Sequence, residues 1–469
     1  MHQDPDEFAL LAAQAEVHRA ARLAPGSAVP RAAQVVEIHG RPEERVFRAA
    51  LDRVAAEADA LRIRVADRDG TPRQRVAAAS TVPLHLLDLR DHPDPLAAAR
   101  AWTRADLEGA GAPGGAPPAT RALVRLADDR YWWYQRVDRI AVDAYGLHLL
   151  GRRTAEVHAA LAAGAEPPRT RFAPLREVVE EAARYLAGRQ YVADREFWAA
   201  RTAGAPPPVN LGGGAPTGNS ATTLHDHLDL PPVTFDRLAV AAAAGRATWV
   251  ELVVAATALH VHRATGARDL VLGLPLTNRC RPAALHTPIA AVNVLPLHLT
   301  VRPQDAGAEL LHRVALEVRS VRRHQRYPRA HLRRDLGPIR AAGPLAGPVV
   351  DVKPFGAALD FGPFAGTVRT LAAGPVQDMT IGVSSAPAGG LRLSVDTRAD
   401  RYDTAATARH RAGLAHLLDG YVELLLTDAQ RPVGSLDPAR GAVSSRTGSA
   451  SRALAPPSPA PNRSPQPTA

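Results

Sequence analysis

Segments typical of strands and segments typical of helices follow one another along most of this chain. Alternating or continuous apolar runs predict strands at 33–39, 61–65, 122–126, 131–137 and 270–274. Apolar residues at helical spacing predict helices at 8–22, 42–60, 145–161, 234–244, 248–265 and 404–426. A chain of 469 residues exceeds what one hydrophobic core covers. We therefore predict a mixed α/β protein with two lobes, over residues 1–175 and 176–440.

Three further segments complete the predicted organisation. The second lobe opens with one long helix over 175–202, which Pro206–Pro208 ends. A hairpin joins strands at 379–383 and 391–395 through a Pro/Gly-rich turn. Residues 441–469 contain mostly Ser, Pro, Ala and Arg, so we expect a disordered tail that cannot bury enough apolar surface to order itself.

The composition excludes several classes of function. The net charge is +10, but the arginines are spread among acidic residues and aromatic residues make up only 4%. Nucleic-acid binders gather their charge in one place and add aromatic stacking groups, so we expect no nucleic-acid partner, whereas an acidic protein partner is compatible. No apolar run is long enough to span a membrane, and the first twenty residues lack a signal-peptide pattern, which predicts a cytoplasmic protein.

Metal and cofactor motifs are also missing from the sequence. The chain has a single cysteine, Cys280, which rules out a disulfide framework and a multi-cysteine metal site. Neither a zinc-binding His/Glu string nor a phosphate-binding glycine loop followed by Lys-Ser/Thr occurs. We therefore expect no metal and no cofactor, and we expect Cys280 to be a small core residue.

The most informative stretch is Tyr131–Gly146, where an aromatic strand runs into a polar loop and then into a helix that opens beside Asp143. This stretch resembles the His-His-x-x-x-Asp-Gly signature of the condensation domains of nonribosomal peptide synthetases. Here the signature reads Asp138-Arg139-x-x-x-Asp143-Ala144, so both histidines and the glycine are replaced.

The resemblance covers about residues 5 to 435, with further family segments in the expected order. These segments are Ala13-Gln14, Leu61-Arg62-Ile63-Arg64, the helix ending in Phe197-Trp198, Gly273 to Arg279, Asn293 to Leu297, Lys353 to Gly356, Leu359 to Gly362 and Gly374 to Asp378. The resemblance implies the fold of chloramphenicol acetyltransferase, as two lobes in a V-shaped pseudodimer with a tunnel between them.

In the resembled family, a carrier-bound acyl thioester and an amine acceptor meet at the signature. The second histidine is associated with catalysis, as a general base or a positioning group, because an imidazole can both accept and donate near neutral pH. Here that position holds Arg139, whose guanidinium has no acceptor, although it could stabilise an oxyanion. The catalytic residues are thus unknown, and Asp138, Arg139 and Asp143 are the signature-equivalent positions.

The resemblance also assigns structural roles. It implies that Asp143 pairs with Arg279 and braces the loop between the lobes. Ala144, Gly146 and Asn293 are the candidate tunnel positions, and Ala144 is compatible with a helical backbone but not with a positive φ. His148, which follows Asp143 by five residues, is expected to be a structural residue of the helix.

Three hypotheses on function remain open. In the first, the chain is a stand-alone, monomeric condensation-domain protein of secondary-metabolite biosynthesis that is impaired in or lacks amide-forming acyl transfer. It would bind a peptidyl or acyl carrier protein in trans or recruit a tailoring enzyme. In the second, it is an active acyltransferase that forms an amide or ester with atypical residues. In the third, it is a relic without a biochemical role.

Overall fold

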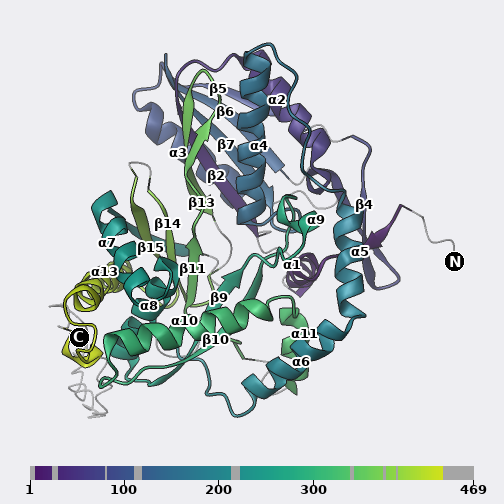
Figure 1. The fold of residues 1–469 in the computed structure, drawn as a ribbon. Coiled ribbons are helices and arrows are strands. Elements are labelled where there is room, and N and C mark those ends of the chain that lie inside the picture. Colours follow the sequence, from purple (N-terminus) through teal and green to yellow (C-terminus); the bar gives the residue numbers. More distant parts are fainter. Residues whose placement is uncertain are drawn as a thin grey trace, which may run out of the picture.

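The structure is a computed structural model that describes residues 6–23, 30–79, 82–109, 119–212, 222–337, 343–372, 376–386 and 389–436. Two six-stranded sheets dominate the described part, one in the upper and one in the lower half of Figure 1, and a three-stranded sheet lies beside them. The mixed α/β fold predicted from the sequence is therefore confirmed. The predicted tail over 441–469 lies outside the described residues.

The first sheet is packed between helices on both faces. Its strand order is β12–β13–β2–β7–β6–β5, with bounds Ala358–Asp360, Ala365–Ala372, Arg31–His39, Arg130–Asp138, Ala119–Ala127 and Leu84–Asp88. Successive side chains of a strand point to opposite faces. On β7, Trp133 therefore packs against α2 (Glu44–Glu57) and α4 (Ala144–Ala162), whereas Trp132 packs on the face covered by α3 (Pro95–Glu108).

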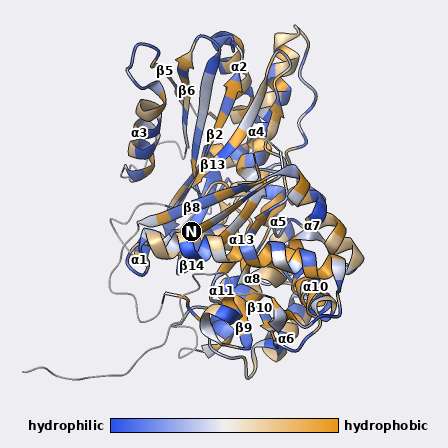
Figure 2. Ribbon diagram, turned by 90° about the vertical axis from the view of Figure 1, so that its left-hand side faces the viewer, coloured by the Kyte–Doolittle hydropathy of each residue, from blue (hydrophilic) through white to orange (hydrophobic). Residues whose placement is uncertain are grey.

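The second sheet carries the largest core. Its order is β10–β9–β11–β14–β15–β8, with bounds Asn293–Thr300, Asp269–Leu276, Val349–Lys353, Met379–Ser385, Leu391–Arg398 and Thr223–Leu230. The helices that pack on it are α7 (Pro232–Ala244), α8 (Trp249–Thr265), α10 (Gly307–Arg323) and α13 (Thr404–Thr427). Hydrophobic residues gather along α8 and the strands near it (Figure 2).

Helix α8 shows how local sequence sets an element's limits. The Thr248 side chain accepts from the backbone of Glu251 while the Glu251 side chain accepts from the backbone of Thr248, which forms a capping box. Gly266 ends the helix in the left-handed conformation at φ 74°.

The smaller elements lie around the two main sheets. The three-stranded sheet has the order β1–β4–β3, with bounds Phe8–Ala9, Thr71–Val76 and Ile63–Arg68. Within the described residues, the remaining helices are α1 (Ala12–Leu23), α5 (Leu175–Leu186), α6 (Arg189–Thr202), α9 (Pro282–Leu285), α11 (Arg329–Asp335) and the 3-10 turns Asp59–Arg62 and Val433–Ser435.

One part of the chain crosses between the predicted lobes. Strand β13 pairs antiparallel with β2, with Val368 opposite Val36, so residues 358–372 extend the first sheet. In Figure 1 the green β13 lies among the purple and blue strands of the first sheet. The first sheet is thus not built from residues 1–175 alone, because the edge of β2 takes its partner from far along the chain. The tunnel and the lobe limits otherwise stay predictions.

Three predicted elements differ from the structure. The prediction of a single helix over 175–202 is wrong, since the helix is interrupted at Ala187–Gly188, between α5 and α6. A glycine weakens a helix at such a position. Phe8–Ala9 is a strand and not the start of a helix, because it pairs with β4. Residues 59–62 form a 3-10 turn, so the strand predicted at 61 begins at Ile63. The hairpin of β14 and β15 is confirmed, although Pro387 and Ala388 of its turn lie outside the described residues.

No single helix in the described ranges is long and apolar enough to cross a membrane. The bent pair α7 and α8 passes that test together, by length and composition only.

Candidate functional site

The loop between β7 and α4 holds the residues of the signature. Asp138 is the last residue of β7, and Asp143 is the N-cap of α4, where its side chain accepts from the Gly146 N–H at 2.8 Å. The carboxylate occupies this position because a helix start leaves backbone donors without partners. The helix thus begins at the signature aspartate, as the sequence predicts.

Asp143 and Arg279 form a bidentate ion pair inside the protein. Arg279 Nη1 lies 2.9 Å from Asp143 Oδ2, and Nη2 lies 2.9 Å from Oδ1. The backbone N–H groups of Ala291 and Val292 each donate to the same carboxylate at 2.9 Å. The carboxylate therefore joins the β7–α4 loop to the segment between β9 and β10, 136 residues away.

The charges of this pair are almost completely withdrawn from water. The side chains of Arg279 and Asp143 are 0% and 4% exposed. Burial alone would raise the pKa of Asp143, but the Arg279 guanidinium and the backbone donors outweigh it and hold that pKa below its usual range. Asp143 is thus an anion held in place, which suits a bracing role and not proton transfer.

The two small residues after Asp143 have different environments. Ala144 is the first residue of α4 and has helical backbone, so a methyl group is accommodated there. Gly146 has no room for one, since an added Cβ would lie 2.3 Å from Val142 Cγ1 and 3.0 Å from the Ile289 carbonyl oxygen. The close contact between α4 and the β9–β10 segment therefore requires glycine at position 146.

Asn293 contacts a different part of the molecule. Its side-chain amide donates to the carbonyl oxygens of Gln325 and Tyr327, at 2.9 and 2.7 Å, and its Oδ1 accepts from the Arg329 N–H at 3.2 Å. These bonds attach the start of β10 to the chain between α10 and α11. The structure thus places Asn293 in a backbone-holding position, and its role in a tunnel stays a prediction.

Asp138 and Arg139 are influenced by different charged groups. Asp138 is near Arg136 at 3.2 Å and Arg31 at 3.9 Å, and burial raises its pKa despite the attraction of both arginines. Burial lowers the pKa of the Arg139 guanidinium, against the opposing attraction of Asp143 and Asp351. Asp138 can accept a proton, whereas the guanidinium offers no lone pair for this purpose.

Comparison with known proteins decides the family. The condensation domain model matches residues 5–424, which is most of the chain. The chain belongs to the condensation domain family. The family predicted from the signature stretch together with the ordered series of segments is therefore confirmed, and with it the acetyltransferase-like fold.

Relatives of known function and structure agree with this assignment. The condensation domain is 35% identical over 438 residues to a dimodular nonribosomal peptide synthase of Bacillus subtilis, covering 91% of this chain and 18% of the relative. It is 38% identical over 416 residues to an isonitrile lipopeptide synthase of Streptomyces coeruleorubidus, covering 88% and 28%. The chain thus spans roughly a fifth to a third of the length of such relatives.

Solved condensation domains superimpose over almost their whole length. The starter condensation domain of rhizomide synthetase, solved as a mutant with C8-CoA, gives a TM-score of 0.83 at 34% identity, covering 92% of this chain and 98% of that one. The first condensation domain of the calcium-dependent antibiotic synthetase, in complex with a substrate analogue, gives 0.84 at 30% identity, covering 93% and 100%. Such domains work with carrier proteins in secondary-metabolite synthesis, which supports this kind of partner here.

The condensation domain has further residues at the signature that the sequence analysis did not single out. Asp351 of β11 is the second carboxylate that acts on Arg139, and it forms an ion pair with Lys353 at 2.8 Å. One property of the sequence could have pointed to the Asp351–Lys353 pair, since Lys353 is the only lysine in the chain. The carboxylate itself carried no such signal, because only the fold brings β11 to the β7–α4 loop.

Aromatic rings surround the first turn of α4. His148 lies 4.7 Å from Phe355 and 6.1 Å from Tyr145 between ring centroids, and the Arg279 guanidinium stands 4.9 Å above the Tyr145 ring. Burial lowers the pKa of His148 to about 4, so its imidazole is neutral at physiological pH. His148 is thus a packed residue of the helix.

Cys280 differs from expectation. The residue is exposed, so the prediction of a small core residue is wrong. The chain turns outward after Arg279, whose side chain points into the interior. Partial burial raises the pKa of the Cys280 thiol, although the nearby arginines act to lower it, so the thiol is not activated. In the described part of the chain, no group of three or more His, Cys, Asp or Glu residues is arranged to hold a metal ion.

Proposed function

We propose that this condensation domain binds acyl-loaded carrier proteins in trans without catalysing amide formation by proton removal. It would act as a carrier-binding or recruitment module of peptide assembly. The observation that carries the proposal is Arg139, which stands at the position of the signature imidazole and feels the charges of the Asp143 and Asp351 carboxylates.

The chemistry of amide formation explains the weight of this substitution. An amine that attacks a thioester must lose a proton, and a general base works best when its pKa is near the operating pH. A guanidinium remains protonated and cannot accept that proton. His148 does not offer a replacement, because its ring is packed against Phe355 within the helix.

The contacts between Asp143 and Arg279 support the proposed binding function, because a binding domain must keep its fold. Asp143, both terminal nitrogens of Arg279 and the N–H donors of Ala291 and Val292 form a buried hydrogen-bond network. Breaking such a network is strongly destabilising, so its retention is consistent with a fold maintained for binding.

One observation favours the alternative of an active acyltransferase. The carboxylate of Asp138 lies next to Arg139 in the sequence, and burial raises its pKa toward the range in which a carboxylate can act as a base. In this alternative, Asp138 removes the proton and Arg139 stabilises the developing oxyanion.

An acyl-transfer assay separates these functions. C8-CoA and Leu-SNAC, the compounds named with the rhizomide synthetase domain, serve as donor and acceptor surrogates. We expect no acylated product above the enzyme-free background, together with saturable binding of an acyl-loaded carrier protein in calorimetry. Absence of both activity and binding would contradict the proposal and leave the relic hypothesis.

Variants make the assay decisive. Turnover that disappears in Asp138→Asn and Arg139→Ala but persists in Arg152→Ala would establish the acyltransferase. Arg152 is an exposed residue of α4, the helix that follows the signature loop, and serves as the matched control. If the triple change Asp138→His, Arg139→His and Ala144→Gly creates turnover, the substrate path is intact and only the signature chemistry was lost.

A further inference from the structure

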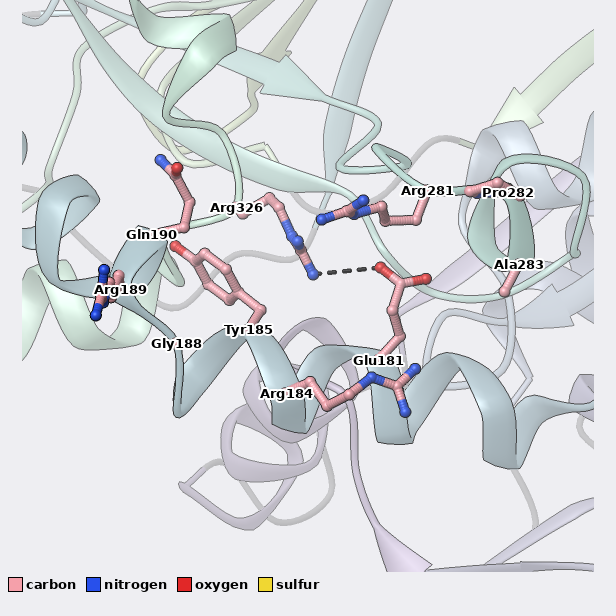
Figure 3. Close-up of a pocket in the computed structure, with 10 residues that line it drawn as sticks. All are labelled: Glu181, Arg184, Tyr185, Gly188, Arg189, Gln190, Arg281, Pro282, Ala283 and Arg326. Atoms are coloured by element: carbon pink, nitrogen blue, oxygen red, sulfur yellow. Dashed lines mark hydrogen bonds and ion pairs between the residues drawn. The ribbon is translucent and has the colours of Figure 1, made fainter.

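A hollow of about 550 Å³ lies beside α5, the start of α6 and the segment that opens α9 (Figure 3). Its charged lining is dominated by arginines that come from separate parts of the chain, namely Arg184, Arg189, Arg281 and Arg326. A second hollow of about 440 Å³ is also lined by Arg281 and Arg326, and Arg323, at the end of α10, contributes to it. The shared arginines show that the two hollows adjoin each other.

The acidic residues of both hollows are already engaged. Glu181 pairs with Arg326 at 3.3 Å, as the dashed line in Figure 3 shows. Asp194 accepts from the Tyr185 hydroxyl at 2.7 Å and the Gln190 amide at 2.6 Å, and it also contacts His324 Nδ1 at 2.8 Å. Five arginines and two carboxylates thus line the two hollows, and one of the carboxylates, Glu181, already pairs with one of these arginines, Arg326, which leaves an excess of positive charge.

Four of these arginines lack a carboxylate among the residues that the structure describes: Arg184, Arg189, Arg281 and Arg323. Many other arginines of the domain are paired; exposed Arg237, for example, contacts both Asp419 and Glu423. Like charges gathered in one place repel each other, so an anion that binds among these arginines lowers this repulsion. The charge pattern therefore points to a negatively charged ligand.

The backbone adds to the same preference. Helix α6 begins at Arg189 after Gly188, and no side chain caps it. Gly188, Arg189 and Gln190 all line the first hollow. The free N–H groups and the dipole of a helix N-terminus favour an anion, so they reinforce the arginines.

We propose that the two hollows form a binding site for a diphosphate group. The planar guanidinium matches phosphate oxygens with paired N–H donors. Arg281 and Arg326 belong to both hollows, so they can bridge two phosphate groups, one in each hollow. The volumes are those of small-ligand sites. The inference does not rest on the function proposed above, because none of the lining residues belongs to the β7–α4 loop.

The single cysteine provides a direct test. Cys280 is exposed and lines the second hollow, so its reaction with the neutral reagent N-ethylmaleimide reports on that site. The rate is measured in metal-free buffer with increasing inorganic pyrophosphate, against sodium chloride at equal ionic strength. We expect pyrophosphate to slow the reaction of Cys280 with N-ethylmaleimide in a saturable way, and we expect sodium chloride not to slow it. Equal effects of both salts, or no effect, would overturn the proposal.

Charge variants assign the effect to the arginines. In Arg281→Gln/Arg323→Gln, the pyrophosphate concentration that gives half protection should rise about tenfold or more, because two charge-assisted contacts are lost. Arg104→Gln, a change of an exposed arginine on α3, should behave like the wild type. Circular dichroism verifies the folding of each variant, and Arg281→Gln alone repeats the test if the double variant is unfolded. Unchanged protection in the folded variant would contradict the assignment.

Comparison of probes identifies the source of the diphosphate. Inorganic phosphate should protect more weakly than pyrophosphate, because it can occupy only one hollow at a time. If ADP protects at lower concentration than pyrophosphate, the site takes an organic diphosphate; the reverse order indicates free pyrophosphate. Protection by phosphate equal to that by pyrophosphate would refute the two-hollow geometry.

Discussion

Replacement of Arg279 by methionine tests the central bracing contact. The change removes both guanidinium donors at 2.9 Å from the Asp143 carboxylate and keeps an apolar stem of similar length. Asp143 is 3% exposed, so its buried charge then loses the only guanidinium that is shown hydrogen-bonded to it among the described residues. Removal of one partner of a buried ion pair costs about 3–5 kcal/mol, and we expect a loss of that size in the free energy of unfolding.

The magnitude is measured by urea unfolding against a matched control. Arg237→Met removes an arginine of an exposed ion-pair group, which should cost at most about 1 kcal/mol. Fluorescence of the buried Trp132, Trp133 and Trp198 reports on both main sheets. A loss in Arg279→Met no larger than that in Arg237→Met would refute the reasoning.

The pH dependence of the same variant provides a second check. In the wild type the pKa of Asp143 is lowered, so its contribution is present above the unfolded pKa and is lost only as pH falls through the folded pKa. Without Arg279, burial should raise this pKa above the unfolded value, and protonation then relieves the unpaired charge. The stability difference from the wild type should therefore be larger at about pH 7 than at about pH 5. A difference that does not change with pH would contradict this explanation.

Two other predictions concern packing and titration. Gly146→Ala should lower the free energy of unfolding by about 1–3 kcal/mol, because the added methyl overlaps Val142, whereas Gly356→Ala, at a position with open space, should be nearly neutral in the same urea titration. The lowered pKa values of His148, about 4, and His260, about 3, mean that the unfolded chain takes up protons below about pH 6.5 while the folded chain does not. The free energy of unfolding should fall by about 1 kcal/mol for each histidine between about pH 7 and about pH 5.5. The variant His148→Gln should lose the part of this fall that His148 causes. A pH dependence in this variant equal to that of the wild type would contradict the prediction.

Much of the local structure could be predicted because it depends on neighbouring residues. Helical spacing located α2, α4, α8 and α13 to within a few residues, and alternation located the hairpin of β14 and β15. The predictions failed where tertiary contacts or a single glycine decided the outcome. Gly188 breaks the helix predicted over 175–202, and pairing with β4 draws Phe8–Ala9 into a strand.

The candidate site was predicted only in part. Its loop could be found because an aromatic strand, a polar loop and a helix start are adjacent in the sequence. The pairing of Asp143 with Arg279 came from the family resemblance, since no spacing rule joins residues 136 positions apart. Asp351 was missed, because a lone carboxylate at the start of a short strand has no pattern of its own.

The sequence by itself determined the alternation of strands and helices, the family, and the replacement of the signature imidazole by Arg139. These properties are carried by side-chain identity and by contacts between near neighbours. Only the tertiary structure decided that β13 pairs with β2 in the first sheet, that the charge of Asp351 acts on Arg139, and that five arginines line adjoining hollows. Each of these depends on packing between segments that are distant in the sequence. The burial of apolar surface sets how these segments pack, and their packing fixes where the charged side chains lie.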